Sequence, residues 1–118
     1  MKKSHEFFFK EAGIFSEKSG HPRFQHGSVC VRKNTIVGRG TNKGRLHAEV
    51  SSLICGQNSQ NNKSLRNSPP VVFVVRVNVS GQFRNSKPCE NCQRFMRRVG
   101  VQKVYFSTDS GFDMMCLT

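Results

Sequence analysis

The chain has 118 residues, enough for one hydrophobic core without disulfide bonds, and we expect residues 1–118 to form a single domain. Nineteen lysines and arginines against seven aspartates and glutamates give a net charge of +12, which favours a polyanionic partner over a solvated basic surface that binds nothing. No stretch reaches the length of a membrane span or of a signal-peptide core, so we expect no membrane association and a soluble protein of the cytoplasm or another intracellular compartment.

An amphipathic helix is predicted near the N-terminus, capped by Ser4 and closed before Gly20. Phe8, Ala12 and Phe15 fall at i, i+4 and i+7, so they form one apolar stripe. The other two phenylalanines of the run at 7–9 are interpreted as packing residues, because aromatics at this spacing fill a core more often than they bind nucleic acid.

A β-hairpin is predicted next, from strands over residues 28–32 and 35–38 joined by the two-residue turn Lys33-Asn34. The glycine-rich stretch 38–44 follows, and glycine lets a backbone approach a ligand closely. Asn42, in this stretch, is either a substrate contact or an ordinary turn residue. The candidate substrate contacts here are Asn42, Lys43 and Arg45.

The remaining predicted elements alternate between helices and strands. Residues 71–77 are a continuous apolar, mostly β-branched run, which indicates a central strand covered on both faces. The last two strands are separated by residues 108–112 alone, too few for a parallel crossover, so they must be antiparallel. The order predicts a three-layer α/β/α domain with a mixed sheet of four to five strands. The other elements are a helix over 46–55, a polar loop over 57–70, a helix over 89–99 ended by Gly100, and strands over 101–107 and 113–117.

Two short segments carry the chemistry. His47 and Glu49 form H-x-E, and Pro88, Cys89 and Cys92 form P-C-x-x-C. A catalytic zinc takes three protein ligands and leaves a fourth position to water, and the histidine and the two cysteines supply one nitrogen and two sulfurs. Glu49 is then left as a carboxylate that can hold and move protons of that water. The pattern predicts one Zn²⁺ per chain, with Glu49 as the catalytic residue.

Helical geometry supports this site. Cys89 and Cys92 are three apart and share one helix face, with Pro88 suited to the first helical position. The partial positive charge of a helix N-terminus favours the thiolates that bind metal. A closed zinc ribbon would need a second ligand pair, and a redox C-x-x-C would leave H-A-E without a role. Cys30 and Cys55 lie in apolar stretches and are interpreted as small buried residues, a cysteine usage that suits a reducing compartment.

With both motifs in this order, the chain resembles the cytidine deaminase-like superfamily over about residues 27–106. The resemblance implies that His47, Cys89 and Cys92 bind zinc and that Glu49 shuttles protons during hydrolytic deamination of a nucleobase. It also implies that Asn42 binds the substrate nucleoside.

The chain departs from the superfamily in one place. The common pattern passes almost straight from the central strand into P-C-x-x-C, whereas here residues 78–87 intervene beside the predicted zinc. This insertion could shape the substrate pocket. Further candidate substrate contacts are Ala48, Arg84, Lys87 and Pro88, and the candidate stacking rings are Phe83, Tyr105 and Phe112.

The substrate is left open between several hypotheses. Cytosine in single-stranded DNA or RNA is favoured by the charge, to which one face of the 89–99 helix contributes, although such a face is usually only solvated. The alternatives are adenosine in tRNA, a free (deoxy)cytidine nucleotide, and a degenerate, non-enzymatic RNA-binding module, against which the presence of Glu49 argues. A homo-oligomer is possible. The arginines of the helix face are Arg94, Arg97 and Arg98.

Overall fold

The computed structural model describes residues 3–17, 25–41, 69–78, 80 and 82–117. The predicted helix over 46–55 and most of the loop over 57–70 lie outside these ranges. Within them, no helix is long and apolar enough to cross a membrane. The elements are α1 (Lys3–Glu17), β1 (Gln25–Arg32), β2 (Thr35–Thr41), β3 (Val71–Val77), β4 (Phe83–Arg84), α4 (Glu90–Val99), β5 (Lys103–Thr108) and β6 (Gly111–Cys116).

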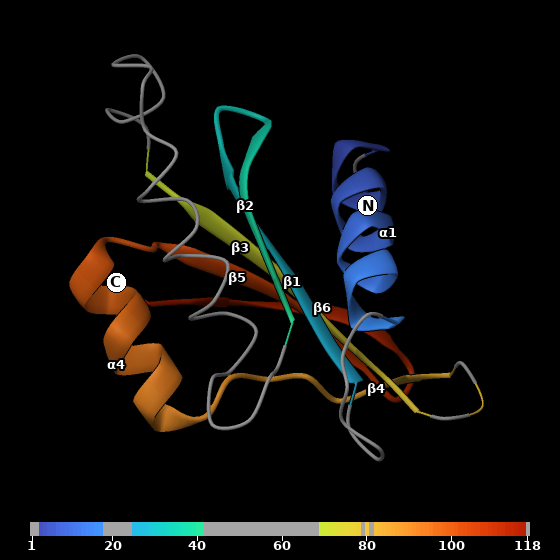
Figure 1. The fold of residues 1–118 in the computed structure, drawn as a ribbon. Helices are drawn as coiled ribbons and strands as arrows, with labels where there is room; N and C mark the ends of the chain where they lie inside the picture. The colour runs from blue at the N-terminus through green and yellow to red at the C-terminus, as the bar shows by residue number, and fades with distance from the viewer. Residues whose placement is uncertain (1–2, 18–24, 42–68, 79, 81, 118) are drawn as a thin grey trace.

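The strands form one mixed sheet in the order β2-β1-β3-β5-β6, with β4 paired to the end of β3. Only the β3–β5 pair is parallel among the described strands. Helix α1 lies on one side of the sheet and α4 on the other (Figure 1). The three-layer α/β/α prediction is therefore confirmed, with the two-residue strand β4 added to the predicted sheet.

The hairpin prediction is confirmed in type and corrected in length. Lys33 and Asn34 have φ values of 51° and 59°, the left-handed conformation that a tight two-residue hairpin turn requires. Strand β2 extends to residue 41 because Gly38 and Gly40 pair with β1, and β1 extends back to residue 25 through its pairing with β3. Residues 38–41 of the glycine-rich stretch are therefore strand, where pairing outweighs the low strand propensity of glycine.

The core under α1 is largely aromatic. Phe8, Phe9 and Ala12 are buried against the sheet, and Phe9 meets Phe73 edge-to-face at 5.2 Å between ring centroids. The helix begins at Lys3, so Ser4 is not its cap. The packing interpretation is confirmed for Phe9 and is wrong for Phe7, which faces outward with 52% exposure. The Phe15 side chain lies outside the described part.

The core under α4 is built from small and flexible side chains. Cys92 and Met96 are buried against Val72, Val74 and Val104 of the two parallel strands. The helix ends as predicted, at a left-handed glycine with φ 98°, whose N–H donates to a carbonyl of the last turn. This packing fixes the N-terminus of α4 relative to the sheet.

Cys30, on β1, belongs to the same core and is chemically protected. Burial raises the pKa of the Cys30 thiol to about 11, against the opposing effect of the Arg32 guanidinium. The thiolate is the reactive form, so at pH 8 we expect Cys30 to be alkylated on the order of 10²-fold more slowly than an ordinary exposed cysteine. Peptide mass spectrometry after timed iodoacetamide treatment can compare it with exposed Cys116. Equal rates for the two thiols would contradict this packing.

Strand β6 is antiparallel to β5, as predicted, and begins two residues earlier than expected. It lies at the end of the described sheet. The Met114 N–H donates to Oδ1 of the exposed Asp113 carboxylate over 2.8 Å. One backbone donor of this strand is therefore satisfied by the side chain that precedes it.

Candidate metal centre

The cysteine pair opens helix α4. Cys89 occupies the N-cap with φ −69° and ψ 166°, and Cys92 is the third helical residue. Both carry thiols; Cys89 is exposed, whereas Cys92 is 4% exposed and packed in the α4 core. The N-terminus of the helix thus carries one exposed and one buried cysteine, beside backbone N–H groups that favour negative charge.

The segment that enters α4 is fixed by local hydrogen bonds. The Pro88 carbonyl accepts a 2.8 Å bond from Nε2 of Gln93, one turn into the helix, and the Cys89 carbonyl accepts one of 2.9 Å from the Gln93 N–H. Pro88 therefore lies one residue before the N-cap, which corrects its predicted place at the first helical position. It is buried, so it shapes the approach to the cysteines.

The partners expected from the H-A-E motif lie outside the described residues. Among the described ranges, no group of three or more His, Cys, Asp or Glu side chains could hold a metal ion, and the third predicted ligand belongs to the segment that is not described. The assignments that stay predictions are His47 as a ligand, Glu49 as the catalytic residue, and Asn42, Lys43, Arg45 and Ala48 as substrate contacts.

The insertion forms a hairpin with the end of β3. Phe83 and Arg84 pair with Val77 and Arg76, and both side chains of β4 are exposed. The Arg84 guanidinium lies 3.9 Å from Oδ1 of Asp109, in the β5–β6 turn. Lys87, also exposed, is two residues before Cys89, so among the predicted cationic contacts of the insertion it is nearest along the chain to the pair.

All three candidate stacking rings face the α1 side of the sheet, away from the face on which Cys92 packs. Tyr105 stacks on Phe73 with 4.7 Å between centroids, and Phe112 stacks on Phe9 at 4.0 Å, both within the α1 core. Alternation along a strand sends neighbouring side chains to opposite faces, and Cys92 packs on the other face. We therefore do not retain Tyr105 and Phe112 as stacking residues. Phe83 is 42% exposed and touches Phe112, so it too is turned toward the α1 side.

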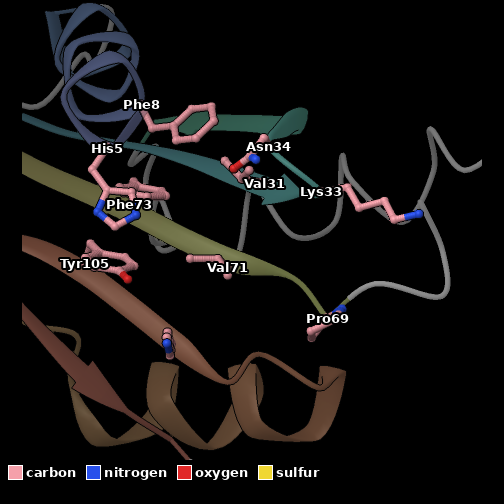
Figure 2. A pocket seen from close by; sticks show the side chains of 10 residues that line it. His5, Phe8, Val31, Lys33, Asn34, Pro69, Val71, Phe73 and Tyr105 are labelled. Carbon is pink, nitrogen blue, oxygen red and sulfur yellow. The ribbon is translucent and has the colours of Figure 1, made fainter. Parts of the chain in front are cut away.

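A hollow of about 340 Å³ lies on the α1 side, near the start of β3 and β5 (Figure 2). The His5 ring sits against Tyr105 with 4.4 Å between centroids, and Phe73 forms the wall beside them. Neither cysteine of the pair lines it, and Tyr105 is the one predicted site residue that does. This hollow is distinct from the candidate metal centre.

The outward face of α4 is basic, and part of that charge is structurally engaged. Nε of Arg97 donates to the Leu117 carbonyl over 2.9 Å, which ties the C-terminal strand region to the helix. Arg94 lies 4.0 Å from the Glu90 carboxylate one turn earlier, and both are exposed. Arg98 is exposed as well. Arg97 therefore has a role in packing, while a binding role of this face stays a prediction.

Sequence reasoning missed two residues beside the centre, Ser86 and Ser107. They are 3% and 0% exposed, and their hydroxyl oxygens are 2.9 Å apart. Ser86 stands in a polar run and Ser107 at the end of a strand, and neither position signals burial.

The fold and the cysteine pair together define a cytidine deaminase-like protein. Residues 2–108 match the family described as the cytidine and deoxycytidylate deaminase zinc-binding region, and the chain belongs to this family. The match spans both predicted motifs. Two thiols at a helix N-terminus suit zinc, which binds readily to cysteine sulfur, so the two described members of the predicted three-residue donor set fit the metal that the family description names.

Solved structures share the fold. The dCMP deaminase of cyanophage S-TIM5 in apo form has a TM-score of 0.70 and 24% identity, covering 90% of this chain and 84% of that chain. The complex of the same enzyme with dCMP and dUMP has a TM-score of 0.68 and 22% identity, covering 90% of this chain and 82% of that chain. Cytidine deaminase from Mycobacterium leprae has a TM-score of 0.61 and 18% identity, covering 92% of this chain and 91% of that chain. A comparison with curated proteins gives no significant match.

Proposed function

We propose that the protein hydrolyses the exocyclic amine of cytosine in a free cytidine or deoxycytidine nucleotide, releasing ammonia and leaving uracil. The observation that carries this proposal is the placement of Cys89 at the N-cap and Cys92 in the first turn of α4, in a chain of the zinc-binding deaminase family. The cyanophage dCMP deaminase, which has been solved in complex with dCMP and dUMP, supports the nucleotide form of the substrate. Residues 1–118 act as one deaminase unit in this proposal.

His47, Cys89 and Cys92 would hold the metal in this mechanism. Zinc bound there would supply Lewis acidity, which lowers the pKa of water toward neutrality. The Glu49 carboxylate accepts one proton as water adds to the carbon that bears the amine, and it passes that proton to the ring nitrogen. It then accepts the second proton from the added hydroxyl and passes it to the departing amine, so that water and cytosine become uracil and ammonia.

A second candidate substrate is cytosine in single-stranded nucleic acid, supported by the net charge of +12. Two observations weigh against it. Tyr105 and Phe112 are packed under α1, and base stacking on aromatic rings is a main source of binding to single strands. Arg97 is bonded to the Leu117 carbonyl rather than presented to a phosphate. The free nucleotide therefore has the stronger support.

Salt dependence separates these substrates. A free nucleotide offers one phosphate group, so a plot of the logarithm of its binding constant against the logarithm of salt concentration should have a slope of about −0.7. A bound oligonucleotide should give a slope several times steeper. We expect turnover of dCMP with the shallow slope, measured by ultraviolet absorbance between low and high salt. Pooled single-stranded DNA and RNA, read by sequencing, and a tRNA stem-loop serve as competing substrates.

Charge reversal provides the matched control for this experiment. Lys87→Glu, beside the cysteine pair, should change oligonucleotide binding more than Lys10→Glu on α1, if a single strand passes the centre. Turnover of oligonucleotides with a steep slope and no turnover of dCMP would reject the free-nucleotide proposal. Zinc binding without turnover of any of these substrates would favour the non-enzymatic module. Sedimentation of the same preparation tests the predicted homo-oligomer.

A further inference from the structure

The parallel ladder between β3 and β5 ends before the two strands do. Its last pair is Val74 with Phe106, although β3 runs on to Val77. Two buried serines, Ser86 and Ser107, lie at this point. Backbone groups left by a broken ladder need other partners when water is excluded, and here the serines provide them.

Ser86 ties its own segment to both strands. Its N–H donates to the Ser107 carbonyl over 2.8 Å, and its hydroxyl donates to the Val74 carbonyl over 3.0 Å. The same hydroxyl accepts a 2.8 Å bond from the Ser107 N–H. One residue is thus fixed to β3 and to β5 at once.

Ser107 extends these bonds to the inserted strand. Its hydroxyl accepts a bond of 3.0 Å from the Arg76 N–H on β3 and lies 2.7 Å from the Arg84 carbonyl on β4. Since a hydroxyl has one hydrogen, it donates either to that carbonyl or to Oγ of Ser86, 2.9 Å away. The two serines therefore join β3, β4 and β5 at the place where β3 and β5 separate.

The anchored serine is only three residues from the first cysteine of the pair. Between them, the Lys87 N–H donates to Oδ1 of Asn85 over 3.0 Å, and Pro88 has its φ fixed by its ring. The path from Ser86 to Cys89 consequently has little conformational freedom.

The rest of the insertion is attached through exposed groups. Both side chains of β4 are exposed, so the strand buries little apolar surface. The ion pair between Arg84 and Asp109 is long and exposed, and such pairs contribute little. The Asn85 N–H donates to Oδ1 of Asp109 over 3.1 Å, also at an exposed site. The serine pair instead ties the segment before Pro88 to β3 and β5 through buried hydrogen bonds.

We propose that Ser86, held by Ser107, is a positioning residue that places Cys89 and Cys92 for metal binding. The inference rests on the proposed function, because it assumes that this pair binds zinc. It predicts that removing one hydroxyl that is not itself a metal ligand changes the affinity and the coordination geometry of the metal.

Ser86→Ala tests the proposal in the full chain. We expect zinc affinity, measured by competition with a chromogenic chelator, to fall about 10- to 100-fold, as it does when outer partners of metal ligands are removed. The visible spectrum of the Co²⁺-loaded variant should shift, because it reports coordination geometry. Ser86→Thr keeps the hydroxyl and should restore most of the affinity.

Ser28→Ala is the matched control, since this serine on β1 is also fully buried but belongs neither to the serine pair nor to the segment that leads into α4. It should lower Tm without changing zinc affinity or the Co²⁺ spectrum. If Ser86→Ala lowers Tm while leaving both metal measurements unchanged, the role is structural and the proposal is wrong. Ser107→Ala, expected to weaken zinc binding less, decides the matter if Ser86→Ala does not fold. A wild-type chain that binds no zinc would instead reject the proposed function.

Discussion

Glu49→Gln is expected to abolish turnover and to leave one zinc bound per chain. The amide keeps the size of the carboxylate but can neither accept a proton from water nor return it to the base, a contribution worth about 10²- to 10⁴-fold in rate. Because the assignment makes this residue a proton carrier and not a ligand, the metal should stay. The rate is measured on dCMP, and metal content by atomic emission.

The control for this variant removes one carboxylate elsewhere. Glu6→Gln lies on the exposed surface of α1 and changes the net charge by the same amount, so it should retain full activity. A metal-free Glu49→Gln protein would show that Glu49 is a ligand, and the roles within H-A-E would have to be reassigned. Full activity of Glu49→Gln would remove it from the mechanism.

Cys89→Ser and Cys92→Ser are both expected to lose the zinc. Zinc binding to a structural site with four protein ligands has a free energy of about 10 to 16 kcal/mol. The average share of one such ligand corresponds to a loss on the order of 10²- to 10³-fold in affinity. Wild-type Tm should therefore fall when a chelator is added, because a ligand at 100 times its Kd stabilises by about 2.7 kcal/mol. In either variant the chelator should change Tm little.

The different burial of the two cysteines separates metal loss from unfolding. Cys89 is exposed, so its serine variant should match the stability of chelated wild type, whereas Cys92→Ser also places a hydroxyl in the α4 core and should be less stable still. Cys116→Ser, at an exposed thiol of β6, should behave as wild type. Zinc retained in both Cys89→Ser and Cys92→Ser would overturn the ligand assignment.

The strongest local patterns predicted the fold well. The run over 71–77 was found as β3 with the same bounds, and Lys33-Asn34 formed the expected turn because both residues adopt positive φ. The direction of β6 followed from the shortness of its connection to β5. Each of these predictions depended on residues close together in the sequence.

The errors arose where distant segments decide the outcome. Strand β4 has two residues and exists through pairing with β3, so no propensity could indicate it. Alternation along β5 showed that Tyr105 and its neighbours face opposite sides, but it could not show which side α4 covers. The same holds for Ser86, which is buried by strands that lie far from it along the chain. The motif singled out both cysteines as candidate metal ligands, but it could not show that one is exposed and the other buried, because this difference depends on how α4 packs.

The Asp113 carboxylate has a consequence for the last strand of the described sheet. Strands at a sheet edge can recruit a strand from another molecule through open backbone donors, which is a route to aggregation. At β6 the carboxylate already holds the Met114 N–H, so an incoming strand would have to displace it and take up a negative charge beside its own backbone. A single acidic side chain thus discourages intermolecular strand addition at this edge.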